Sequence, residues 1–237
     1  MSGDISKERN KISAMFNGIA GSYDLLNHLL SLGIDKYWRR VLISHSMKKG
    51  PAKALDIATG TGDIAIALYK AGVETTAIDI ADQMVEIAKE KCRKLKESNI
   101  SKPIFFIASA DDIPFEEKSF QLVTIGFGIR NFENRKRALK EIFRVLQNGG
   151  ELSILEFASP KNKIWGALYR FYFHNILPLI GKLVSKDMEA YTYLPQSVSQ
   201  FPQYIAFCKE LEEVGFINTS FRPLTGGVSV LYTASKL

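Results

Sequence analysis

Apolar and polar positions along the chain change period several times, and these changes predict strands that alternate with helices. The predicted strands are short apolar runs at 54–58, 74–79, 103–108, 121–125 and 151–156. Apolar residues at helical spacing fill the intervals, and the last of these helices is predicted to carry Leu146 and to end at the glycines 149–150. Strands that alternate with helices indicate an α/β fold with a mostly parallel, doubly wound sheet.

Helical spacing also covers Met15 to Met47, ahead of the first predicted strand. Two helices are predicted there, one with Tyr23 and Leu26 on a shared face and one with Trp38 and Leu42 on another. The apolar face of each amphipathic helix has to be buried against another part of the protein. We therefore expect them to form a lid or wall over a ligand site at the end of the first strand.

The end of the chain breaks the alternation of strands and helices. A helix over about 203–214 ends at Gly215, and strands predicted at 217–224 and 228–235 are joined by the short turn Thr225-Gly226-Gly227. Two strands with so short a connection must be antiparallel. A parallel sheet that ends in an antiparallel hairpin resembles that of S-adenosylmethionine-dependent methyltransferases, whereas a nicotinamide dehydrogenase would continue with parallel strands.

The turn after the first predicted strand, Ala58-Thr59-Gly60-Thr61-Gly62, is the first candidate for a binding site. A strand that ends in glycines and opens onto a helix leaves backbone N–H groups beside a crevice, where a nucleotide-like ligand can approach the main chain. Gly-x-Gly alone also occurs in ordinary tight turns. Asp79 adds a second signal, because an acid at a strand end about 20 residues later can accept ribose hydroxyls. The same carboxylate could instead cap the helix that starts near Ala81.

Small, polar or charged residues follow the ends of several predicted strands. Because ligands of open α/β sheets lie outside the carboxyl ends of the strands, we expect these residues to converge on one rim. The residues that map there are Asp56, Asp79, Ser109, Gly126, Arg130 and Glu156. Their convergence predicts an active site.

Composition narrows the function classes. The 237 residues are 46% hydrophobic, enough for one substantial domain, and the two cysteines suggest neither a disulfide framework nor a metal site. The polar N-terminus lacks the apolar core of a secretory signal, so a cytoplasmic protein is expected. The net charge of +6 admits nucleic acid, an anionic membrane or a basic enzyme. No aromatic stacking motif accompanies the lysines at 89–96, so no nucleic-acid partner is expected.

Two specific motifs stand out, Tyr23-Asp24-Leu25-Leu26-Asn27 and Phe127-Gly128-Ile129-Arg130-Asn131-Phe132. Further matching stretches are 31–39, 144–157 and 191–195. Together they cover nearly the whole chain, and they resemble the menaquinone and ubiquinone biosynthesis C-methyltransferases. The resemblance implies a class I S-adenosylmethionine-dependent methyltransferase fold and C-methylation of a polyprenylated quinol. Demethylmenaquinol is the expected acceptor, and 2-polyprenyl-6-methoxy-1,4-benzoquinol is the alternative.

The resemblance also implies roles for individual residues. S-adenosylmethionine is the expected cofactor, and no metal is expected. The implied cofactor-binding residues are Asp56, Gly60, Thr61, Gly62, Asp79, Ser109, Ala110 and Gly126, and the implied catalytic residues are Arg130, Asn131 and Tyr23.

The chemistry of the acceptor gives Arg130 a specific predicted role. A fixed guanidinium beside a quinol oxygen would favour the oxyanion, because guanidinium itself stays protonated. The alternative is an ion pair between Arg130 and Glu133 or Glu156. Asn131 could orient the ring or a water molecule, and His28 is an alternative base.

Some positions depart from the family's usual residues. Asp35 stands where histidine is usual, Ala58 where glycine is common, Asn148 where proline is usual and Ala158 where serine is usual, and Tyr232 stands where histidine is frequent. Of these, Asp35 and Tyr232 leave the details of the substrate site open.

We expect a single methyltransferase domain with four parts, a helical lid at 1–50, a cofactor-binding core at 51–156, a helical cap insertion at 160–200, and a helix with the hairpin at 201–237. The aromatic stretch 164–184 is interrupted by charged residues, so it is not expected to span a membrane. It is either a lipid-facing wall, with peripheral contact to the inner face of a membrane, or a packed cap helix.

Partners and alternative functions complete these expectations. The expected partners are the quinol, a peripheral membrane contact and a second copy in a homodimer. Two functions from other classes stay open. One is a nicotinamide dehydrogenase that uses Gly60, Gly62 and Asp79, and the other is a silent nucleotide-binding scaffold.

Overall fold

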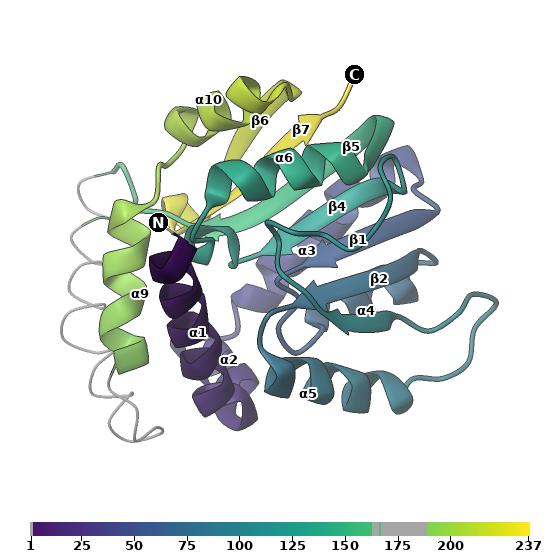
Figure 1. Cartoon of the computed structure of the whole chain (residues 1–237), viewed down its shortest axis with the longest axis horizontal. Coiled ribbons are helices and arrows are strands. Elements are labelled where there is room, and N and C mark those ends of the chain that lie inside the picture. The colour runs from purple at the N-terminus through teal and green to yellow at the C-terminus, as the bar shows by residue number, and fades with distance from the viewer. Residues whose placement is uncertain (1, 163–165, 167–188) are drawn as a thin grey trace.

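The computed structural model describes residues 2–162, 166 and 189–237 of the chain. Within this part, seven strands form one sheet in the order β3-β2-β1-β4-β5-β7-β6, with helices on both faces (Figure 1). The strands are β1 (Lys53–Ile57), β2 (Glu74–Asp79), β3 (Ile104–Ile107), β4 (Phe120–Gly126), β5 (Leu146–Phe157), β6 (Ile217–Leu224) and β7 (Ser229–Ser235). Strands β1 to β5 run parallel, and β7 pairs antiparallel with both β5 and β6. The mostly parallel sheet with a terminal antiparallel hairpin is thereby confirmed.

The described α-helices are α1 (Ser2–Ile19), α2 (Tyr23–Leu30), α3 (Asp35–Ser46), α4 (Asp63–Lys70), α5 (Asp82–Arg93), α6 (Arg135–Val145), α9 (Glu189–Gln200) and α10 (Ile205–Val214). The prediction of two helices before the first strand is wrong, because three lie there. A 3-10 turn at Ala20–Ser22 separates α1 from α2. Leu32 and Gly33, both at positive φ, then end α2 and turn the chain into α3.

Helices cover both faces of the sheet, and alternate residues of β1 show which helix covers which face. Leu55 packs in one cluster with Leu139 of α6 and Phe207 of α10. Its neighbour Ala54 packs in another cluster with Leu42 of α3. A central parallel strand buried on both faces is mostly apolar, which is why residues 54–57 of β1 are apolar in the sequence except for Asp56.

The predicted end of the helix before the fifth strand is wrong. Helix α6 ends at Val145, and Leu146 already has extended backbone angles as the first residue of β5. Leu146 is buried in the same cluster as Ile142 of α6, so its apolar side chain continues the helical spacing across the boundary. The glycines 149–150 lie within an irregular part of β5, where its register with β4 shifts.

Helices α1, α2 and α9 lie beside the carboxyl ends of the parallel strands, whereas α3 packs on one face of the sheet (Figure 1). None of the helices in the described residues is long and apolar enough to cross a membrane. The aromatic stretch 164–184 lies outside the described residues except for Gly166. The prediction about that stretch therefore has no structural outcome.

Candidate active site

A pocket opens at the carboxyl ends of the parallel strands, as the sheet topology predicts. Its empty volume, open solvent included, is about 810 Å³. Most of the predicted site residues line it, namely Tyr23, Gly60, Asp79, Ser109, Ala110, Gly126 and Asn131. Four others, Asp56, Thr61, Gly62 and Arg130, do not.

Backbone conformation explains the two glycines of the turn. Gly60 and Gly62 have φ values of +55° and +83°, in the left-handed region. A Cβ atom at Gly62 would lie 3.0 Å from the Cβ of Ala88 on α5 and 3.2 Å from the ring of Phe105 on β3. Gly62 also forms the N-cap of α4. It therefore allows close packing behind the turn, and its implied role in cofactor binding stays a prediction.

Asp79 lies at the wall of the pocket and holds two backbone N–H groups. Its Oδ2 accepts a hydrogen bond of 2.7 Å from Gly60 N, and its Oδ1 accepts one of 2.9 Å from Ala81 N at the start of α5. Burial raises the pKa of this carboxyl above its usual value, although the two N–H groups oppose the shift. Asp79 therefore accepts a hydrogen bond from the N-terminus of α5, as the capping alternative predicts. Ribose binding by the same carboxylate stays a prediction.

Asp56 lies beneath the turn rather than in the pocket. Its carboxylate accepts hydrogen bonds from the hydroxyls of Thr59, at 2.6 Å, and Thr124, at 2.7 Å. Burial raises the pKa of Asp56 to about 7, against the opposing effect of these hydroxyls. The carboxylate ties the turn to β4, and the implied cofactor-binding role of Asp56 stays a prediction.

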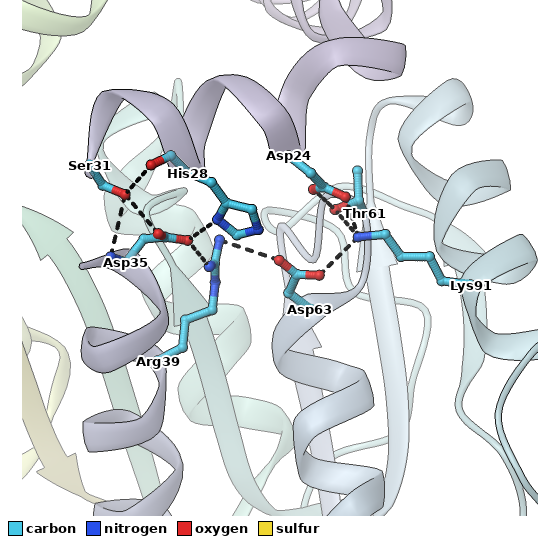
Figure 2. Close-up of polar contacts among 8 residues, drawn as sticks. All are labelled: Asp24, His28, Ser31, Asp35, Arg39, Thr61, Asp63 and Lys91. Atoms are coloured by element: carbon cyan, nitrogen blue, oxygen red, sulfur yellow. Dashed lines mark hydrogen bonds and ion pairs between the residues drawn. The ribbon is translucent and has the colours of Figure 1, made fainter. Parts of the chain in front are cut away.

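Thr61 does not line the pocket. Its side chain lies in a cluster of charged residues (Figure 2). Its hydroxyl donates to Asp24 Oδ1 at 2.5 Å and accepts from Lys91 Nζ at 2.9 Å. Lys91 further pairs with Asp24, at 2.5 Å, and with Asp63, at 2.9 Å. These contacts fasten α2 to the glycine turn. No sequence pattern predicts these contacts, because the residues that make them lie far apart along the chain.

Asp35 forms the centre of the other half of this cluster (Figure 2). It accepts from Ser31 Oγ at 2.7 Å, lies 2.7 Å from His28 Nδ1 and pairs with Arg39. Burial alone would raise the pKa of Asp35, but the Ser31 hydroxyl and the charge of Arg39 hold it below its usual value. His28 thus contacts Asp35 and does not line the pocket, so the prediction of His28 as an alternative base is not supported.

Arg130 is held in a buried ion pair. Its Nη1 lies 2.7 Å from Glu156 Oε1, and the exposed fractions of the two side chains are 7% and 0%. Its Nε donates to Ser197 Oγ of α9 at 3.3 Å, and its guanidinium also contacts the carbonyl of Phe127. The ion pair considered as the alternative is therefore present. Glu156 balances the charge of this guanidinium, and the role of Arg130 as a fixed cation beside a substrate oxygen stays a prediction.

Asn131 and Tyr23 both line the pocket. The hydroxyl of Tyr193 on α9 donates to Asn131 Oδ1 at 2.9 Å. Tyr23 packs edge-on against Phe16 of α1, with ring centroids 6.1 Å apart. Burial raises the pKa of Tyr23, so its hydroxyl stays protonated at neutral pH.

Sequence comparison relates this chain to known enzymes. A family model described as the ubiE/COQ5 methyltransferase family matches residues 4–236. The chain belongs to this family. A demethylmenaquinone methyltransferase of Chlorobaculum parvum is 43% identical over 236 residues, which cover 98% of this chain and 95% of the relative. A ubiquinone/menaquinone biosynthesis C-methyltransferase UbiE of Geotalea daltonii is 42% identical over 235 residues, 98% of this chain and 99% of the relative.

Solved structures agree with the fold. The structure of an S-adenosylmethionine-dependent methyltransferase from Thermotoga maritima, titled a possible histamine N-methyltransferase, has a TM-score of 0.64 at 16% identity and covers 94% of this chain and 99% of its own. Such a likeness shows the fold alone. The class I methyltransferase fold expected from the sequence is confirmed.

Two features of this ubiE/COQ5 family member were missed or left open by the sequence. Ile12 and Phe16 of α1 line the pocket but were not predicted as site residues. Helical spacing from Ile12 to Tyr23 was the signal that could have placed them on one face with Tyr23. Tyr232 is fully buried, and its hydroxyl accepts a hydrogen bond of 2.8 Å from Tyr204 N. This departure from the family's usual histidine thus lies in the core and not on the pocket wall.

Proposed function

We propose that this protein transfers a methyl group from S-adenosylmethionine to a ring carbon of a polyprenylated quinol, with demethylmenaquinol as the preferred acceptor. The observation that carries the proposal is a single pocket that joins Gly60 and Asp79 to Tyr23 and Asn131. The relative named demethylmenaquinone methyltransferase supports the naphthoquinol. The relative named ubiquinone/menaquinone biosynthesis C-methyltransferase keeps the methoxybenzoquinol as the second candidate.

The donor half of the pocket fits S-adenosylmethionine. Asp79 would accept the ribose hydroxyls, and Ser109 and Ala110 would leave room for adenine against apolar Ile80 and Met84, which share the wall. When bound, the donor supplies a methyl group that its sulfonium already activates for transfer. The chain therefore has to bind and orient, and no metal is required.

The acceptor half has to favour charge on a ring oxygen. A quinol hydroxyl resembles tyrosine, with a pKa of about 10, and its oxyanion pushes electron density onto the adjacent carbon. Because Tyr193 donates to the amide oxygen of Asn131, the amide nitrogen is the group left to donate to that ring oxygen. Tyr23 is a neutral phenol and would pack against the ring rather than act as a base.

Arg130 acts in this proposal as a positioning residue. Its side chain pairs with Glu156 Oε1 while its backbone N donates to Glu156 Oε2 at 3.1 Å. Both contacts fix the 3-10 turn Ile129–Asn131 that carries Asn131 into the pocket. The lid at residues 1–50 would complete the site by excluding water, since Ile12, Phe16 and Tyr23 close one wall.

Methyl incorporation from labelled S-adenosylmethionine into short-chain demethylmenaquinol and methoxybenzoquinol tests the proposal directly. Replacing one donor to a developing oxyanion typically costs about a hundredfold in kcat, so Asn131→Ala should lose that much turnover and keep donor affinity in calorimetry. Asn99→Ala, on the exposed surface, is the matched control. Binding of NADH in place of the donor would support the dehydrogenase, and donor binding without methyl transfer to either quinol would support the scaffold.

A further inference from the structure

Helix α2 carries apolar side chains on two opposite faces. Tyr23 lines the pocket and Leu26 is 4% exposed, so these residues face the protein. On the outer face, Leu25 is 62% exposed and Leu29 is 40% exposed. A surface helix of a soluble protein normally places polar side chains on its outer face. The outer face of α2 is therefore suited to a second apolar environment.

The corner after α2 continues this apolar surface under backbone strain. Leu32 is 77% exposed and has a φ of +52°, in the left-handed region that leucine rarely adopts. Little packing offsets that strain, because most of the side chain is accessible. Ile34 and Tyr37 are exposed next to it. We call Leu25, Leu29, Leu32, Ile34 and Tyr37 the α2–α3 patch.

Positive charge borders the α2–α3 patch. Lys36 and Arg40 are exposed on α3, and neither has an ion pair within the described residues. The acids of these two helices are already engaged, Asp24 by Lys91 and Asp35 by Arg39 (Figure 2). The corner thus presents leucines and unbalanced cations together, which is the composition that binds anionic lipid surfaces.

We propose that the α2–α3 patch docks the protein on an anionic lipid bilayer, with Leu32 at the tip entering the boundary of the acyl chains. The proposal rests on the proposed function, because a polyprenyl tail keeps the acceptor in a bilayer. The same helix that presents Leu25 and Leu29 to lipid carries Tyr23 into the pocket. Docking through α2 would therefore bring the pocket next to the lipid that holds the acceptor.

Co-sedimentation with phosphatidylglycerol-containing vesicles, and with pure phosphatidylcholine vesicles, tests the surface. Burying one leucine side chain changes partitioning by about tenfold or more, so Leu32→Asn should weaken binding to anionic vesicles by that factor. Asparagine tolerates the left-handed backbone, which keeps the corner folded. Leu237→Asn, at a residue that is 79% exposed far along the chain, is the matched control and should bind normally.

Charge and activity provide independent readouts. Lys36→Gln with Arg40→Gln should lower binding to anionic vesicles severalfold and remove its salt dependence. Leu32→Asn should methylate a short-chain soluble quinol at the wild-type rate but a long-chain quinol in vesicles more slowly. Equal binding of wild type and Leu32→Asn, or no preference for anionic vesicles, would overturn the docking surface. So would self-association of the wild type through Leu32 without vesicle binding. Failure to methylate any quinol would instead overturn the proposed function.

Discussion

The two halves of the pocket are built in different ways. The donor half depends on a backbone turn after a strand that is buried on both faces, with Gly60 at the pocket wall and Gly62 packed behind it, both at positive φ. The acceptor half is formed by side-chain contacts between distant segments, such as Asn131 with Tyr193 of α9. Backbone geometry is fixed by the turn and the sheet, whereas a side-chain contact can be removed one partner at a time. We therefore expect substitutions in the donor half to lower the stability of the fold. In the acceptor half, we expect the size of each effect to depend on how deeply the lost contact is buried.

The largest effect is expected from Glu156→Leu. This change leaves the guanidinium of Arg130 buried without its partner, which costs about 3–5 kcal/mol of unfolding free energy. Urea unfolding followed by circular dichroism measures it. Arg130→Met combined with Glu156→Leu should recover most of the stability while turnover stays low, because the turn that carries Asn131 loses its anchors. If Glu156→Leu alone were as stable as wild type, the cost of leaving Arg130 buried without its partner would be contradicted.

Gly62→Ala tests the donor half. Alanine at this φ is strained by roughly 1–2 kcal/mol, and its Cβ would press on Ala88 and Phe105, so we expect a total loss of about 2–3 kcal/mol. Gly72→Ala is the matched control, because Gly72 has a similar φ of +91° with no neighbouring atom within 4 Å of a Cβ. Equal losses in urea unfolding would show that backbone strain alone, and not packing behind the turn, requires Gly62.

Tyr193→Phe is expected to act on turnover rather than folding. A neutral hydrogen bond is worth about 0.5–1.5 kcal/mol, so losing the donor to Asn131 should lower kcat about threefold to tenfold with an unchanged KM for the methyl donor. Tyr69→Phe removes a hydroxyl that donates to Lys96 O at 3.0 Å and serves as the control. If Tyr193→Phe raised KM for the donor and kept kcat, Tyr193 would not position Asn131.

Lys91→Met should have a smaller effect, because the side chains of Lys91, Asp24 and Asp63 are each about one-third exposed and solvent screens their pairing. Exposed ion pairs contribute roughly 0.2–1 kcal/mol, so we expect stability to fall by less than about 1 kcal/mol and KM for the donor to rise a few-fold as α2 loosens. Lys89→Met, which breaks only an exposed pair with Glu86, should change neither. An unchanged KM in Lys91→Met would mean that α2 is held by packing alone.

The smallest expected effect is a gain in stability from Ala58→Gly. Ala58 has a φ of +52°, and relief of left-handed strain worth roughly 1–2 kcal/mol is partly offset by the entropy of glycine, about 0.5–1 kcal/mol. A net gain of about 0.5 kcal/mol in urea unfolding should follow. A net loss would show that the Cβ of Ala58 contributes to packing at the turn.

The sheet was predictable because its strands are short apolar runs bounded by glycine turns, and the β6–β7 hairpin follows from the short turn at Thr225–Gly227. The glycines and Asp79 were predictable for the same reason, since local spacing places them at strand ends. The contacts of Arg130 were not, because the sequence offered Glu133 and Glu156 equally and only the register of β5 beside β4 brings Glu156 close. Asp24 with Lys91 likewise depends on how α2 packs on the turn.

The carboxyl of Asp56 beneath the turn makes the unfolding free energy depend on pH. Its pKa is about 7 in the folded protein against 3.8 as the ordinary value, so folding takes up a proton between these two pH values. Because the native state then binds more protons than the unfolded chain, the unfolding free energy falls as pH rises through this interval and levels off above it. Asp56→Asn should flatten this slope in urea titrations at pH 5 and pH 8. The pH of the solution therefore changes the stability of the fold through the carboxyl beneath the glycine turn.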